Sequence, residues 1–125
     1  MINLIPLADD YSIYQLDFDQ KIPSQILDSG FYSITRTSDE VSIVASCRID
    51  MENLKADHGW KGFKVAGILD FSLVGIINDI TKPLKDNSIS VFVISTFNTD
   101  YIFVKKESFE RSIEIFRSSD NICIR

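Results

Sequence analysis

The residue types that carry out catalytic or metal chemistry are scarce in this sequence. It has one histidine, His58, and two cysteines, Cys47 and Cys123, which lie far apart without C-x-x-C spacing. A zinc site needs about four such ligands, and an enzyme site needs a nucleophile beside a base, a carboxylate pair or a metal cluster. No glycine-rich phosphate loop occurs either. We therefore expect no catalysis, no metal and no cofactor, and we expect both thiols to be reduced and partly buried.

Backbone amides at the start of a helix offer a different chemistry, the binding of anions. An amphipathic helix is predicted from about Phe71 to Lys85. Its apolar face is formed by Leu73, Ile76, Ile77, Ile80 and Leu84. The first N–H groups of such a helix have no partner inside it and favour negative charge.

The turn before this helix is a candidate binding site. The amides of Phe71, Ser72 and Leu73 are expected to point outward, and Gly75 is expected to let a ligand or a neighbouring backbone come close. Asp70 stands immediately before the helix. We favour an N-cap role for Asp70, with direct ligand contact as the alternative, and Ser72 has the same two interpretations.

The first half of the chain alternates between strand and turn patterns. Residues Tyr11 to Phe18 predict a strand, and Ile22 to Gly30 predict a short helix with Pro at its start and Gly past its end. Residues Phe31 to Cys47 predict a hairpin. The stretch from Ile49 to Gly59 is polar and weakly helical, and Trp60 to Leu69 returns to strand character.

The second half has a clearer pattern after the predicted helix. Residues Ile89 to Thr96 are almost continuously apolar and β-branched, which predicts a central strand. The turn residues from Phe97 to Asp100 then lead into a strand at Tyr101 to Val104. A helix capped by Ser108 and a short edge strand at Ile122 to Ile124 end the predicted order.

The order strand, helix, strand, strand, helix, strand predicts an α+β fold of the ferredoxin-like type. It is complete in the second half and abbreviated in the first. We therefore expect two βαββαβ units in tandem, residues 1–60 and residues 61–125, with antiparallel sheets and helices on one face. The chain has 125 residues, enough for one compact domain or for two very small units that share a core.

Charge and composition exclude several partners. The formal net charge is −5, and no cluster of Lys and Arg suited to nucleic acid or to an anionic membrane is present. No apolar run approaches the roughly 18 residues that a membrane helix needs, and the start of the sequence lacks the pattern of a signal peptide. We expect a cytoplasmic protein that binds neither nucleic acid nor membrane.

Three stretches resemble the ACT domain. They are GILDFSLVGI from Gly67, ISVFVISTFNTDY from Ile89 and FYSITRTSDEVSIV from Phe31. The likeness is to short tandem-ACT proteins related to the CASTOR-type arginine sensors and to the ACT units of aspartate kinases. It covers nearly the whole chain and implies a regulatory module that binds an amino acid or a similar small effector.

The resemblance points to Thr96, Phe97 and Asp100 as further ligand-binding residues. Binding of a free amino acid needs an anion site for its carboxylate and an acceptor for its ammonium. We expect the helix start to supply the first and Asp100 the second, although Asp100 also suits a purely turn-forming role. Phe97, like Phe71, either stacks on a ligand or covers the core.

Two other polar residues have weaker claims to a site. His58 is interpreted as a surface loop residue, although histidine is the residue type most often used as a pH switch. Arg36 either pairs with a ligand carboxylate or forms a weak surface ion pair.

The resemblance thus implies a sensor or allosteric effector module without catalysis, with an amino acid as ligand and a homodimer or an enzyme as partner. The alternative is an oligomerisation or partner-docking module with a vestigial pocket, because the apolar strand around Ile89 is suited to pairing with another sheet. RNA-binding domains share this fold class, but they use basic residues on central strands, and Ile89 to Thr96 has none.

Overall fold

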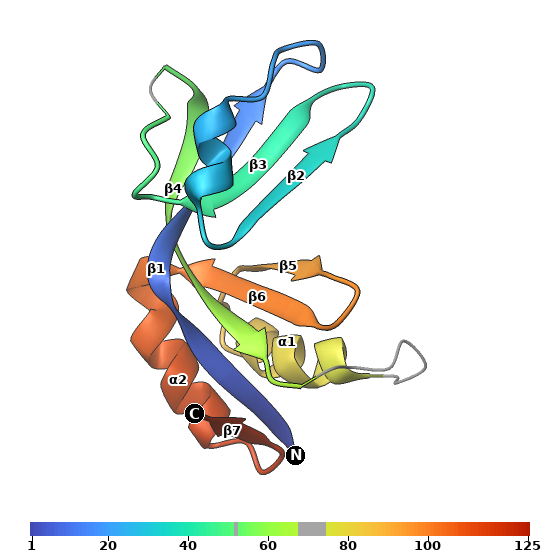
Figure 1. The fold of residues 1–125 in the computed structure, drawn as a ribbon. Coiled ribbons are helices and arrows are strands. Elements are labelled where there is room, and N and C mark those ends of the chain that lie inside the picture. Colours follow the sequence, from blue (N-terminus) through green and yellow to red (C-terminus); the bar gives the residue numbers. More distant parts are fainter. Residues whose placement is uncertain (52, 68–74) are drawn as a thin grey trace. The chain divides into compact units, whose positions relative to one another are not determined.

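The structure is a computed structural model that describes residues 1–51, 53–67 and 75–125. The described residues form an α+β fold, as predicted (Figure 1). Its elements are β1 (Ile2–Leu16), the 3-10 helix η1 (Ser24–Asp28), β2 (Tyr32–Arg36), β3 (Val41–Ser46), β4 (Lys55–Val65), α1 (Ile76–Asp86), β5 (Val91–Ser95), β6 (Asp100–Lys105), the 3-10 helix η2 (Lys106–Ser108), α2 (Phe109–Arg117) and β7 (Ile122–Ile124). Within the described ranges, each helix is too short or too polar to cross a membrane.

The chain divides into two compact units. The N-terminal unit is Asp9–Trp60, and the C-terminal unit combines Met1–Ala8 with Lys61–Arg125. The first eight residues therefore belong to the C-terminal unit, whereas the sequence predicted that residues 1–60 form one unit. The reason is strand pairing, because Ile2 and Leu4 pair in parallel with β7 and Leu4 is fully buried. That the two units are two separate ACT domains stays a prediction.

In the sheet of the N-terminal unit, β1 lies between β3 and β4, and β2 lies on the other side of β3. Strands β2 and β3 form the predicted hairpin, and β3 also pairs with β1. The hairpin turn is closed by Thr37, whose Oγ1 accepts hydrogen bonds from the amides of Asp39 and Glu40 at 3.1 and 3.2 Å. The predicted short helix is the 3-10 turn η1, which buries Ile26 against the sheet.

One face of this sheet carries the core of the N-terminal unit. Alternate residues of β1 and β3 point to that face because side chains alternate along a strand. The core cluster contains Tyr14, Leu16, Ile26, Val41, Ile43, Ala45 and Met51.

The prediction of a weakly helical stretch from Ile49 to Gly59 was wrong. Strand β4 begins at Lys55 and continues to Val65. Tertiary packing outweighs the weak local preference there, since Ala56 packs against the core cluster.

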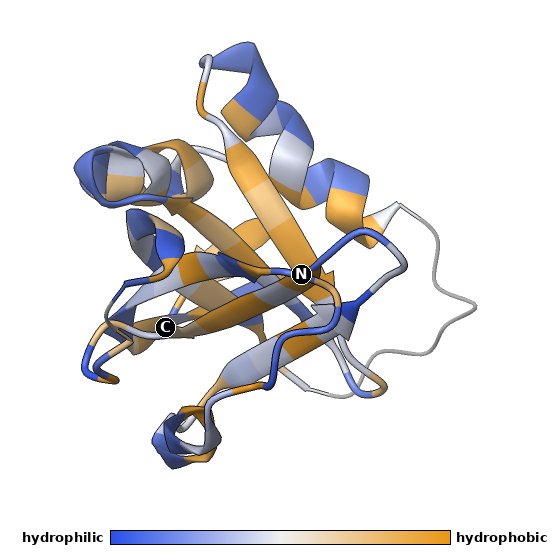
Figure 2. Cartoon of the chain, turned by 90° about the horizontal axis from the view of Figure 1, so that it is seen from above, coloured by the Kyte–Doolittle hydropathy of each residue, from blue (hydrophilic) through white to orange (hydrophobic). Residues whose placement is uncertain are grey.

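The C-terminal unit follows the order β4, α1, β5, β6, α2, β7, with the first residues of β1 as an additional strand. Both α-helices pack on one core cluster and contact each other. That core contains Leu4, Phe63, Val65, Ile80, Leu84, Ile89, Ile102, Val104, Phe116 and Ile122. Figure 2 shows apolar residues concentrated in the strands and polar residues in the turns.

The apolar segment from Ile89 is not a central strand, contrary to the prediction. Strand β5 stands at the end of the strand order and pairs antiparallel with β6. Its four apolar residues are only partly buried: Val91, Phe92, Val93 and Ile94. Both faces of the strand are therefore partly covered, which explains why residues on both faces are apolar. The prediction of a hairpin at this position is confirmed.

Candidate functional site

Half of the predicted ligand-binding residues fall within the described part of the chain. Asp70, Phe71, Ser72 and Leu73 lie outside it. Gly75, Thr96, Phe97 and Asp100 are described, and all four belong to the C-terminal unit.

Gly75 occupies the N-cap position of α1 in a left-handed conformation, with φ of 87°. Glycine adopts this conformation without strain because it lacks a Cβ. A Cβ built there would meet no described atom within 4 Å, so the positive φ accounts for a glycine here, and the close approach of a ligand stays a prediction. The helix begins at Ile76, and its first amides belong to Ile76, Ile77 and Asn78.

Thr96 closes the β5–β6 turn. Its amide donates to the Thr99 carbonyl at 2.8 Å, and its Oγ1 accepts from the Thr99 amide at 3.3 Å. Thr99 is buried, and its Oγ1 donates to the Val65 carbonyl at 2.7 Å. This bond, which the sequence did not reveal, fixes the turn against the end of β4.

Asp100 is hydrogen-bonded at this turn, whereas Phe97 is exposed. The Asp100 carboxylate accepts a 2.5 Å hydrogen bond from Ser95 Oγ, its cross-strand partner. One such bond leaves acceptor capacity, because a carboxylate accepts several hydrogen bonds. The Phe97 side chain is 82% exposed, so it does not cover the core.

The described site residues gather at one end of the C-terminal unit. The β5–β6 turn is bonded to the end of β4, and Figure 1 shows the start of α1 at this same end. An amide-rich helix start and an acidic turn at one end are what the predicted site requires. The site itself stays a prediction.

His58 and Arg36 have structural partners. His58 lies in β4, not in a loop, and its Nδ1 shares a 2.7 Å hydrogen bond with the buried Ser12 Oγ. The Arg36 guanidinium donates to the carbonyls of Phe18 and Gln20 and so fastens the segment that follows β1. Among the described residues Arg36 forms these backbone hydrogen bonds and not the surface ion pair that was one of its two predicted roles, and its contact with a ligand stays a prediction.

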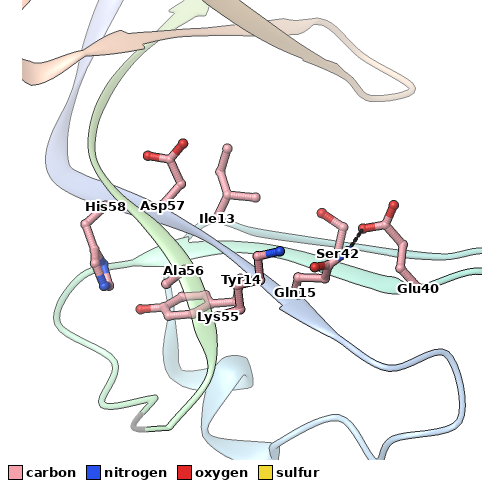
Figure 3. Close-up of a pocket in the computed structure, with 9 residues that line it drawn as sticks. All are labelled: Ile13, Tyr14, Gln15, Glu40, Ser42, Lys55, Ala56, Asp57 and His58. Carbon is pink, nitrogen blue, oxygen red and sulfur yellow. Dashed lines mark hydrogen bonds between the residues drawn. The ribbon is translucent and has the colours of Figure 1, made fainter.

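A cavity that the sequence did not indicate lies within the N-terminal unit (Figure 3). Its volume is about 460 Å³, and its polar and apolar side chains come from β1, β3, β4 and the β2–β3 turn. They include Ile13, Gln15, Glu40, Ser42, Lys55 and Asp57. Lys55 and Asp57 stand at alternate positions, as side chains on one face of a strand do. This pattern was missed because the stretch was interpreted as weakly helical.

A further cavity of about 410 Å³ lies between α1 and β5 in the C-terminal unit. It is lined partly by Lys82 and Lys85. Lys82 already donates a 2.7 Å hydrogen bond to Asp86, and this bond holds the pKa of the Asp86 carboxyl below its usual value. The paired lysine makes this cavity a poorer candidate for an anion. None of the four described residues of the predicted site lines either cavity.

Comparison with known proteins identifies the family. A family model described as an ACT domain matches residues 55–118. A second model, described as an N-terminal domain, matches residues 9–51. No curated protein sequence matches the chain.

Solved structures extend this likeness over the whole chain. A protein from Agobacterium tumefaciens is 33% identical, with 99% of this chain and 93% of that chain covered and a TM-score of 0.90. A Vibrio cholerae protein of unknown function, described as a possible transport protein, is 18% identical with a TM-score of 0.72 over 91% of this chain and 86% of that chain. The ligand-free regulatory subunit of aspartate kinase from Thermus thermophilus is 9% identical with a TM-score of 0.67, over 94% of this chain and 97% of that chain. The last two likenesses concern the fold alone.

The matched segment spans half of the chain, and this chain belongs to the ACT-domain family. The predicted resemblance to ACT domains is confirmed. The closer likeness to CASTOR-type arginine sensors stays a prediction.

Proposed function

We propose that this protein is a regulatory module that binds an amino acid and catalyses no reaction. In this proposal it consists of two ferredoxin-like ACT units in tandem. The observation that carries the proposal is membership of the ACT family. It is supported by the hydrogen bond from Thr99 to the Val65 carbonyl, which holds the β5–β6 turn against the end of β4. The regulatory subunit of an aspartate kinase, which has the same fold, supports the regulatory role.

The proposed ligand lies between the segment from Asp70 to Gly75 and the turn from Thr96 to Asp100. The first amides of the helix region receive the ligand carboxylate, and Asp100 accepts its ammonium. Binding shifts a pre-existing equilibrium of the module and so reports to a partner, which is an enzyme or a second copy of the chain. The proposed location is the cytoplasm, which the two free thiols support.

Thermal unfolding in the presence of each common L-amino acid tests this proposal. A ligand at 100 times its dissociation constant stabilises a folded protein by about 2.7 kcal/mol, which raises the melting temperature. We expect at least one amino acid to raise the melting temperature of the natural protein. The same amino acid should not raise the melting temperature of Asp100→Ala. The control is Asp120→Ala, which removes an exposed carboxylate from the same unit. An unchanged ligand effect in Asp100→Ala would remove Asp100 from the site.

A second function is favoured by the position of β5. This strand ends the strand order, and its apolar residues are partly exposed, so its free edge is suited to pairing with another chain. The alternative proposal is therefore an oligomerisation or partner-docking module with a vestigial pocket. It gains support if no amino acid changes the melting temperature while the protein sediments as a dimer and co-purifies with an enzyme.

A further inference from the structure

The outer face of the N-terminal sheet carries a group of side chains that the proposed function does not use. Tyr14 of β1, Ile43 of β3 and Ala56 of β4 point toward the core cluster. Because side chains alternate along a strand, their sequence neighbours point to the opposite face. The cavity of about 460 Å³ is lined by five such neighbours, Ile13, Gln15, Ser42, Lys55 and Asp57, by Glu40, and also by Tyr14, Ala56 and His58 (Figure 3).

The strand register and two hydrogen bonds hold the acidic side of this cavity in place. Gln15 and Ser42 are direct cross-strand partners, so their side chains lie next to each other. Gln15 Nε2 donates to Glu40 Oε1 at 3.2 Å, and the Glu40 amide donates to Thr37 Oγ1 at 3.2 Å. One hydrogen bond therefore holds the Glu40 carboxylate, and the other holds the Glu40 backbone.

Charges of both signs line this one cavity. Lys55 supplies a cation, and Glu40 and Asp57 supply carboxylates. Within residues 1–51, 53–67 and 75–125, neither Lys55 nor Glu40 takes part in an ion pair. Asp57 is oriented by the indole of Trp60, whose Nε1 donates to Asp57 Oδ1 at 3.3 Å. Lys55 and Glu40 thus share a cavity without pairing with each other, which suits a ligand that carries both signs.

We infer that this cavity of the N-terminal unit is a second ligand site, which binds a small zwitterion of the α-amino-acid type. Lys55 pairs with the ligand carboxylate, and Glu40 accepts a hydrogen bond from its ammonium. Ile13 provides an apolar wall for the ligand side chain, and the volume lies within the range of small-molecule sites, roughly 300–1,000 Å³. The inference rests on the proposed function for the class of ligand, but it assigns a site in the other unit.

The test is a titration of the ¹⁵N-labelled protein with each common L-amino acid, followed by NMR chemical shifts. Lys55→Met and Glu40→Gln each remove one charge from the cavity, and Glu40→Gln keeps an acceptor for Gln15. The matched controls are Lys21→Met and Asp39→Asn, because both side chains are exposed in the same unit and do not line the cavity. We expect each cavity variant to weaken binding about tenfold or more, as the loss of a charge-assisted hydrogen bond predicts. The controls should stay within about twofold of the natural protein.

The amide signals separate this inference from the proposed function. Shifts in Ile13–Gln15 and Lys55–His58 that weaken in both cavity variants support the second site, whatever the C-terminal unit does. Shifts confined to the segment from Thr96 to Asp100 overturn the second site and leave the proposed function standing. Shifts in the N-terminal unit that survive both cavity variants unchanged also overturn it. If no amino acid shifts any signal, both proposals fail.

Discussion

The side chain of Thr99 is 4% exposed, and its hydroxyl donates a hydrogen bond to the last carbonyl of β4, that of Val65. Its amide and carbonyl also bond to Thr96 across the turn. Thr99 thus joins the β5–β6 turn to a second strand, and it controls the position of Asp100, the next residue.

Replacing Thr99 by Val removes this hydroxyl while it keeps the shape of the side chain. The Val65 carbonyl then loses a buried partner, which costs about 1–3 kcal/mol of unfolding free energy. Urea unfolding followed by circular dichroism measures the change. The control is Thr35→Val on β2, where the side chain is exposed and the change should stay within about 0.5 kcal/mol. Equal effects at the two positions would contradict the role assigned to Thr99.

At this scale the sequence predicted residue types better than partners. Asp100 was predicted in the turn, whereas it is the first residue of β6, and its bond to Ser95 depends on the register of two strands, which no local pattern specifies. Arg36 was predicted to form an ion pair, whereas it bonds backbone carbonyls of a segment far away in sequence. Such partners appear only when the chain is folded.

Strand β4 passes very close to its neighbours at Gly62. A Cβ at this position would lie 2.7 Å from Phe103 Cε1 and 2.8 Å from Leu7 Cδ1. The Phe103 ring is fully buried and stacks on Phe92, with 4.6 Å between the ring centroids. The buried Phe103 ring has little room to move.

Gly62→Ala should therefore lower the unfolding free energy by about 1–3 kcal/mol, the usual cost of overpacking. Gly30→Ala is the control, because a Cβ at Gly30 would meet no atom within 4 Å. Thermal unfolding compares the two variants. Should Gly62→Ala prove as stable as Gly30→Ala, the close approach of β4 to Phe103 would be refuted.

The elements that the sequence predicted are those with strong local signals. Both hairpins have polar turns between β-rich runs, and the structure contains both. The early start of β1 and the early start of β4 were missed because their causes are distant: Ile2 pairs with Ile122, and His58 bonds Ser12. Likewise, the edge position of β5 depends on the order of strands and not on its own composition.

At the scale of the whole molecule, the described residues contain two hydrophobic core clusters that share no member. One belongs to each unit. Strands β1 and β4 nevertheless run from one unit into the other.

The central claim is that this ACT-family chain binds an amino acid and leaves it chemically unchanged. Isothermal titration calorimetry of the natural protein with each common L-amino acid tests it most directly, with NMR of the ligand after long incubation. The account predicts a saturable heat for at least one amino acid and an unaltered ligand spectrum. No heat with any amino acid, or conversion of the ligand into another compound, would contradict it.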